Sequence, residues 1–307
     1  MEWRNAAMRT YRLYQVDAFT REKWTGNPAG VVPDARGLDD KDMLRIAREM
    51  NNSETAFVFP GEGTDYDVHV RFFTPTREVS LCGHATVAAH YVLAREKGMT
   101  GGRVYQQTGA GILPVDIQSR EDDVRIVMTQ GRIEYGDQIA GDHAKTLLKA
   151  LGLHTSDLVE SRPLQIVSTG HSKVMVPIRS LDTLHALRPD NVALIALSEK
   201  IPCNGYYVFT ADWADSLFPV HGRMFAPAAG IPEDPVTGNA NGPLGAYLVH
   251  HRLVEHDGQC FSFDAIQGES MLRPGVISVE VTIRDNEPAL VKISGNAVIV
   301  FKTEISV

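Results

Sequence analysis

The sequence has few cysteines, no long apolar run and no basic block. Three cysteines at scattered spacing among 307 residues argue against a disulfide framework and favour a reducing, cytoplasmic setting. The longest apolar runs, such as Val192–Leu197 and Ala297–Phe301, are far too short to span a bilayer. The net charge is −8 and no run of five or six basic residues occurs. Nucleic acid and membranes are therefore not expected as partners.

Motifs for cofactors, metals and targeting are also missing. The glycine-containing segments Gly26–Gly30 and Gly109–Gly111 fit neither GxGxxG nor GxxxxGK[ST], so no nucleotide loop is supported. GxSxG and HExxH do not occur. The segment Met1–Gln15 has no apolar core of the kind that secretory signals carry. We expect no cofactor and no bound metal.

What the sequence does contain is an internal repeat. The matching blocks are Thr25-Gly26 with Thr169-Gly170, Val32-Pro33 with Val176-Pro177, Glu54–Phe59 with Asn204–Phe209, Phe72–Pro75 with Met224–Pro227, Cys82–Ala85 with Thr237–Ala240, and Tyr105-Gln106 with Ile266-Gln267. Their spacing grows from 144 residues, between Gly26 and Gly170, to 161 residues, between Gln106 and Gln267. Small loop insertions in a duplicated domain would leave this pattern.

A repeat of half the chain predicts two similar domains, as the length also suggests. We expect an N-terminal lobe at 1–135 and a C-terminal lobe at 136–307, divided in the turn-rich segment Gly131–Gly141, with the last strand returning to the first lobe. Helical and alternating stretches are mixed, so the fold class is α+β. Expected helices end at Met50 after an Asp39 or Asp40 cap, run over Thr86–Lys97, and begin at Pro243. A cleft between two domains is a preferred place for a small-molecule site.

The first candidate site residue is Glu54, in the polar turn that precedes the apolar segment Ala56–Phe59. Desolvation of a carboxylate disfavours its charged form and suits it to proton transfer. A solvated turn residue is the simpler interpretation of an isolated glutamate. The repeat favours the functional one, because equivalent turns of two facing domains tend to share a cleft.

The second candidate is the segment Cys82–Thr86, where small residues lead into a helix. Open backbone N–H groups and the helix dipole favour an anion there, and His84 can exchange a proton near neutral pH. A capping histidine beside a small buried cysteine is the structural alternative. A Cys-x-His pair is a poor zinc site, because zinc takes three or four protein ligands.

The third candidate is the segment Glu233–Pro243, the twin of the second in the repeat. Here Asp234 supplies a further acid or acceptor, although an Asp-Pro step is also a turn former. If the lobes face each other, two helix N-termini converge on one small anionic metabolite.

Together these motifs resemble the PhzF (phenazine biosynthesis-like) family, and in particular its YddE-like branch. The motifs that carry the resemblance are Gly26–Val31, Ser53–Phe57, Arg71–Pro75, Cys82–Thr86 and Glu233–Pro243. The resemblance extends from about Tyr14 to Phe301. It implies a diaminopimelate-epimerase-like fold of two lobes, each a curved sheet around a central helix, with cofactor-independent isomerisation in the cleft and usually a homodimer.

The resemblance also implies roles for individual residues. Glu54 matches the family's proton-shuttling glutamate, and His84 and Asp234 match its other two active-site groups. The matched glycine-containing turns give the substrate-binding residues Gly83, Ala85, Thr86, Gly238, Asn239 and Ala240. Asn239 stands where the phenazine enzyme has serine, and Cys82 lies opposite Thr237 in the repeat, so a two-thiol mechanism is not available.

We therefore expect an isomerase that moves a proton on a small carboxylate-bearing metabolite. Two alternatives remain open at this point. One is an amino-acid epimerase, racemase or dehydratase that uses Cys82. The other is a two-lobed protein that binds a metabolite without transforming it.

Overall fold

The computed structural model describes residues 9–120, 123–213 and 218–307. The prediction for Met1–Gln15 falls partly on residues 1–8, outside this range. The chain forms two compact units. Unit 1 contains the residues up to Trp24 together with Pro28–Ile126 and Asn296–Val307, and unit 2 contains Thr25–Asn27 and Val127–Gly295.

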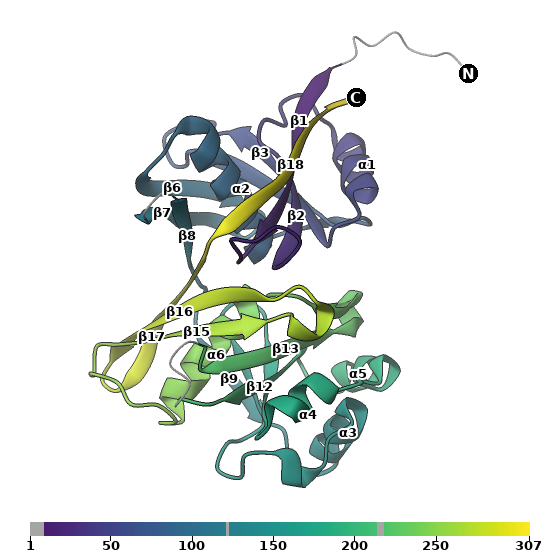
Figure 1. The fold of residues 1–307 in the computed structure, drawn as a ribbon, viewed down its shortest axis with the longest axis vertical. Coiled ribbons are helices and arrows are strands. Elements are labelled where there is room, and N and C mark those ends of the chain that lie inside the picture. Colours follow the sequence, from purple (N-terminus) through teal and green to yellow (C-terminus); the bar gives the residue numbers. More distant parts are fainter. Residues whose placement is uncertain (1–8, 121–122, 214–217) are drawn as a thin grey trace. The chain divides into compact units, whose positions relative to one another are not determined.

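Unit 1 is built on one curved sheet (Figure 1). Its strands are β1 (Thr10–Ala18), β2 (Asn27–Val32), β3 (Glu54–Pro60), β4 (Val68–Phe73), β5 (Glu78–Val79), β6 (Gly101–Thr108), β7 (Gly111–Arg120) and β18 (Ala297–Ser306). β18 pairs antiparallel with β1, and β1 pairs with β2. β2 then runs parallel to β3, β3 antiparallel to β4, β4 parallel to β6, and β6 antiparallel to β7.

Unit 2 repeats this order of pairings. Its strands are β9 (Glu134–Gln138), β10 (Gln165–Ser168), β11 (Lys173–Pro177), β12 (Tyr206–Ala211), β13 (Val220–Ala226), β14 (Ile231–Asp234), β15 (Cys260–Gln267), β16 (Gly275–Arg284) and β17 (Glu287–Gly295), and β8 (Asp123–Thr129) spans the division between the units. β9 pairs antiparallel with β10. β11 runs parallel to β12, β12 antiparallel to β13, β13 parallel to β15, and β15 antiparallel to β16.

The pairings confirm the duplication and correct two of its alignments. Val32 pairs with Phe57, and Val176 pairs with Val208, so Phe57 matches Val208 and not Tyr207. By the same comparison, Val68 pairs with Gln106 and Val220 pairs with Ala265. Gln106 therefore matches Ala265 and not Gln267. Short apolar strands resemble each other at neighbouring registers, and only hydrogen-bond partners distinguish the registers.

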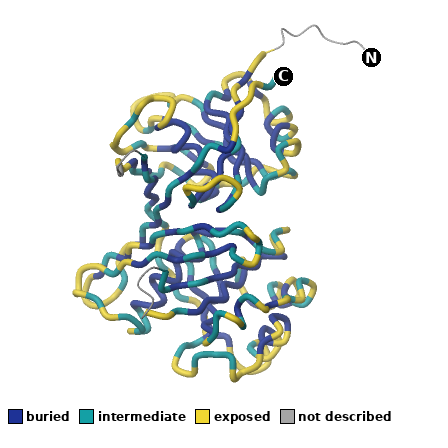
Figure 2. The backbone as a smooth tube through the Cα atoms, viewed as in Figure 1, coloured by how far each residue is buried: buried dark blue, intermediate teal, exposed yellow. Residues whose placement is uncertain are grey.

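Each unit has one central helix. α2 (Gly83–Lys97) is buried without interruption from His84 to Ala94 and ends at Gly98 in the left-handed conformation (Figure 2). α6 (Gly238–His250) is buried from Ala240 to Val249. Both helices are buried on all sides over these residues, as expected for helices surrounded by a sheet.

Both central helices begin earlier than the sequence predicts. α2 starts at Gly83 instead of Thr86, and α6 starts at Gly238 instead of Pro243. Proline was expected to open α6, but it lies inside the helix, where its missing N–H leaves the carbonyl of Asn239 without its usual donor. Asn239 has non-helical backbone angles (φ −82°, ψ 21°), which accommodate this missing bond.

The remaining helices lie outside these cores. They are α1 (Asp40–Met50), α3 (Gly141–Leu151), α4 (Leu181–Ala186) and α5 (Asn191–Ser198), with short 3-10 turns at Thr155–Asp157, Pro227–Ala229 and Glu269–Met271. Asp39 caps α1 by accepting a hydrogen bond from the Asp42 N–H, as predicted. The segment Gly131–Gly141, predicted as turns, contains β9. Among the described residues, no helix is long and apolar enough to cross a membrane.

Candidate active site

In unit 1, Glu54 is held at the first position of β3 by the turn before it. α1 ends where Asn51 adopts the left-handed conformation at φ 51°. Asn52 and Gln15 exchange two side-chain amide hydrogen bonds, of 2.8 and 3.2 Å. These contacts bring the chain into β3 at Glu54, which is only 9% exposed. The predicted helix, polar turn and buried strand are thus all present.

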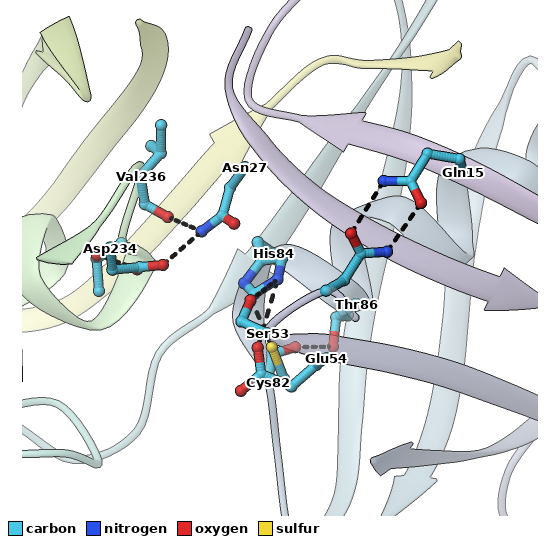
Figure 3. A network of polar contacts seen from close by, with 11 residues as sticks. Gln15, Asn27, Ser53, Glu54, Cys82, His84, Thr86, Asp234 and Val236 are labelled. Atoms are coloured by element: carbon cyan, nitrogen blue, oxygen red, sulfur yellow. Dashed lines mark hydrogen bonds and ion pairs between the residues drawn. The ribbon is translucent and has the colours of Figure 1, made fainter. Parts of the chain in front are cut away.

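Three groups gather around the imidazole of His84 (Figure 3). Its Nε2 lies 3.5 Å from Oε2 of Glu54 and 3.3 Å from Oγ of Ser53, and its Nδ1 lies 3.4 Å from Sγ of Cys82. His84 and Cys82 are buried, at 7% and 8% exposure. A carboxylate, an imidazole and a thiol in contact can pass a proton among themselves and to a bound ligand. Sequence reasoning had singled out Glu54 and His84, and their contact is a product of the fold.

The first turn of α2 leaves backbone donors open. Cys82 occupies the N-cap position but makes no side-chain capping bond. Thr86 donates from its hydroxyl and from its N–H to the Cys82 carbonyl, at 2.7 and 3.0 Å, so both of these donors stabilise the turn itself. Gly83 and Ala85, which precede Thr86 in this turn, carry no polar side chain, and Ala85 is fully buried. Backbone N–H groups at such a terminus attract an anion.

In unit 2, Asp234 is buried and held at both carboxylate oxygens. Its Oδ1 accepts a hydrogen bond of 2.9 Å from Nδ2 of Asn27, which also donates to the carbonyl of Val236 at 2.8 Å (Figure 3). Its Oδ2 accepts from the hydroxyl of Thr237. Asp234 is 7% exposed and Asn27 fully buried. Both donors hold the carboxylate in one orientation.

A second layer of amides supports this carboxylate. Gln267 donates from Nε2 to the Asp234 carbonyl at 2.8 Å and to Oγ1 of Thr237 at 3.1 Å. Asn241 donates to Oε1 of Gln267 at 3.0 Å and accepts from the hydroxyl of Tyr207 at 2.7 Å. Buried hydrogen-bond networks of this kind restrict the geometry of the groups they hold.

Sequence reasoning missed Asn27 and Gln267 as parts of the Asp234 site, and it placed Thr237 in the candidate segment without a role. Asn27 lies in the Gly26–Val31 motif, which contributes to the family resemblance but by itself assigns no role to Asn27. The chain enters unit 2 at Thr25–Asn27. There the Gly26 N–H donates to the Pro274 carbonyl, and Nε of Arg273 donates to the Gly26 carbonyl. The sequence carries no local sign of such long-range partners.

The start of α6 matches the start of α2. Thr237 could cap the helix, but its hydroxyl donates to Asp234, and no side-chain capping bond forms. Asn241 donates to the Thr237 carbonyl at 3.0 Å, as Thr86 does to the Cys82 carbonyl in the other unit. Gly238, Asn239 and Ala240 form the first turn, and a side chain at 238 would meet Cδ1 of Ile293 at 2.5 Å.

One group of side chains in the described residues has the donor types of a metal site. Glu54, Cys82 and His84 each offer one ligand atom, and these atoms lie within 4.8 Å of one another. An oxygen, a sulfur and a nitrogen are the ligand types that zinc takes. The same three groups form the acid–base cluster described above.

The sequence matches the family described as phenazine biosynthesis-like protein (PhzC-PhzF) over residues 16–303. It is 59% identical to an uncharacterised isomerase of Clostridium acetobutylicum, covering 97% of this chain and 99% of that protein. It is 47% identical to the uncharacterised isomerase YddE of Escherichia coli K12, covering 95% and 97%. It is also 30% identical to the trans-2,3-dihydro-3-hydroxyanthranilate isomerase of Pseudomonas aeruginosa, covering 93% and 96%.

Solved structures share the whole fold. The structure of a PhzF-family phenazine biosynthesis protein from Bacillus anthracis has a TM-score of 0.87 at 35% identity, and the match covers 97% of this chain and 99% of that one. A hydroxyproline epimerase from Agrobacterium vitis has a TM-score of 0.65 at 13% identity, covering 98% and 92%. At that identity the second match concerns the fold alone, and the predicted epimerase-like α+β architecture is confirmed.

Proposed function

Because the chain belongs to the phenazine biosynthesis-like (PhzC-PhzF) family of isomerases, we propose that it moves a proton within a small carboxylate-bearing metabolite by acid–base catalysis without a cofactor. Glu54 takes the proton from a carbon next to an activating group and returns it at another position of the same molecule. His84 accepts or donates the proton on Glu54, and Asp234 acts on the substrate from its own half of the site.

The observation that supports this proposal most directly is the buried contact between Glu54 and His84. Their 3.5 Å separation allows a proton to move from one to the other with small adjustments, since apo contacts of catalytic pairs are often long. The first turns of α2 and α6 supply open N–H groups for the substrate carboxylate and for charge that develops during transfer. In this proposal, one substrate is bound both by Glu54, His84 and the start of α2 and by Asp234 and the start of α6. Homodimer formation and a cytoplasmic location stay predictions.

The experiment is a metabolite screen in deuterated water, read by mass spectrometry, with the wild-type chain and a Glu54→Gln variant. A positioned acid–base group contributes about 10²–10⁴-fold in rate, so we expect a loss of that size in turnover while the folded structure is kept. Glu49→Gln, an exposed change in the preceding helix, is the matched control. Full turnover by Glu54→Gln on a proven substrate would refute the assignment.

A thiol-dependent epimerase or racemase is the second candidate, favoured by the 3.4 Å contact between Cys82 and His84. An imidazole beside a thiol can take its proton and leave a reactive thiolate. Cys82→Ser separates the two functions in the same screen. Retained turnover supports the glutamate mechanism, and loss as large as that of Glu54→Gln supports the thiol mechanism.

A further inference from the structure

Unit 2 contains a buried lysine for which the acid–base scheme has no use. Lys173 is the first residue of β11 and is only 3% exposed. Within the described residues, its ammonium makes one hydrogen bond, of 3.3 Å, to the carbonyl of the adjacent Ser172. An ammonium carries three donors. A buried one that uses a single donor is an unusual feature that calls for a functional explanation.

Among the described residues, the ionisable groups that interact electrostatically with the Lys173 ammonium are Asp234, Cys203 and His171. Asp234 is the carboxylate among them, and its two oxygens already accept from Asn27 and Thr237. No carboxylate of the described residues forms an ion pair with Lys173. Burial lowers the pKa of Lys173 to about 8, which leaves most of it protonated at neutral pH. The cation thus has donors available for an anion that the chain itself does not supply.

The duplicated fold shows how unusual this position is. In unit 1, Ala29 pairs with Glu54 across β2 and β3. The matching position in unit 2 joins Lys173, on β11, with Gly205, just before β12, next to the pair Val174 and Tyr206. One half has a small residue opposite a carboxylate, and the other has an ammonium opposite a glycine.

Gly205 leaves room for the Phe225 carbonyl and for the stem of Lys173. A Cβ at position 205 would lie 2.8 Å from the Phe225 carbonyl oxygen and 3.3 Å from Cδ of Lys173. The lysine stem therefore lies over the glycine, on the side where unit 1 carries its catalytic carboxylate. At this matched pair of positions, the carboxylate comes from β3 in unit 1 and the ammonium comes from β11 in unit 2.

We propose that Lys173 is a substrate-binding residue whose ammonium recognises a carboxylate of the substrate in the Asp234 half of the site. This inference rests on the proposed function, in which the substrate carries a carboxylate. It adds a residue that selects for that group by charge, which the uncharged N–H groups at the helix ends do less strongly.

A matched pair of probes tests the assignment without any turnover. The probes are 2-aminobenzoate and 2-aminobenzamide, which differ in the charge of one group, with binding measured by ligand-observed NMR titration. The wild-type chain should bind the carboxylate more tightly than the amide, and this preference should fade as the pH rises above 8. Lys173→Met should lose affinity for the carboxylate by about tenfold or more and leave amide binding unchanged. Lys200→Met, at an exposed lysine of the same unit, should behave as wild type.

A stability measurement separates a binding role from a structural one. Methionine replaces the buried cation by an apolar chain of similar length, so Lys173→Met should unfold at the same or a higher denaturant concentration. A wild-type chain without preference for the carboxylate, or a Lys173→Met variant that keeps it or is destabilised, would overturn the assignment. Glu54→Gln should retain the probe preference, so failure of the proton-transfer scheme and failure of the lysine assignment give different results.

Discussion

At the scale of single residues, Thr237 connects the helix end with the acid. Its side chain could cap α6, but its hydroxyl donates to Asp234 and its Oγ1 accepts from Gln267. One hydroxyl thus orients the carboxylate and leaves the first amides of α6 open. Residue type alone does not distinguish these two uses of a threonine, because both require the same short polar side chain.

We expect Thr237→Val to weaken both stability and turnover. Valine keeps the shape and removes a donor and an acceptor from a buried network, which costs about 1–3 kcal/mol when the partners stay unsatisfied. Chemical denaturation and the proton-exchange assay measure the two effects. Thr237→Ser, which keeps the hydroxyl, is the control. A valine variant as stable and active as wild type would show that the hydroxyl does not hold Asp234.

At the scale of elements, the two central helices begin with glycines that serve different purposes. A Cβ at Gly83 would meet nothing within 4 Å, whereas a Cβ at Gly238 would lie 2.5 Å from Cδ1 of Ile293. Packing therefore explains the glycine of α6. It does not explain the glycine of α2, where the open space lies beside the amides that we assign to the substrate.

This difference predicts that alanine at position 83 mainly affects turnover, whereas alanine at position 238 affects stability. Gly83→Ala should change the free energy of unfolding by less than about 1 kcal/mol but reduce turnover, because a methyl group then stands beside the open amides. Gly238→Ala should lower the free energy of unfolding by up to about 1–3 kcal/mol, because the end of the fully buried Ile293 side chain must move. Denaturation curves and kinetics of both variants check this. A fully active Gly83→Ala variant would remove the start of α2 from the binding site.

At the scale of the whole molecule, burial of one histidine makes stability depend on pH. His90, in α2, is fully buried, and its Nε2 lies 2.9 Å from Oε1 of Gln106. Burial lowers its pKa from 6.5 to about 4. Between these values the unfolded chain binds a proton that the folded chain refuses. Stability is therefore lost as the pH falls through 6.5 towards 4.

The expected loss from this residue is on the order of 3 kcal/mol over that range. Denaturation of wild type and His90→Gln at pH 7 and pH 4.5 measures it, and the variant should lose less stability between the two pH values. His143→Gln, at an exposed histidine, should lose as much as wild type. Equal losses for His90→Gln and wild type would contradict the neutral, buried state of His90.

Much of the fold was predictable because its signals are local or repeated. The duplication, the buried strand after Glu54, and the end of α2 before Gly98 follow from apolar patterning and from a glycine that adopts the left-handed conformation. The starts of α2 and α6 were placed too late, because glycine and proline usually mark helix boundaries. In these two helices, burial inside a sheet overrides that preference.

Sequence patterns alone predict two like halves, a glycine-containing turn before a central helix in each half, and three candidate acid–base residues, Glu54, His84 and Asp234, in polar turns. Only the tertiary structure brought His84 against Glu54 and Cys82, gave Asp234 its donors from Asn27 and Thr237, and buried Lys173 over Gly205. The reason is physical. Periodicity and turn chemistry act between neighbours in the chain, whereas hydrogen-bond partners and burial depend on residues that are far apart in sequence and meet only in the packed fold.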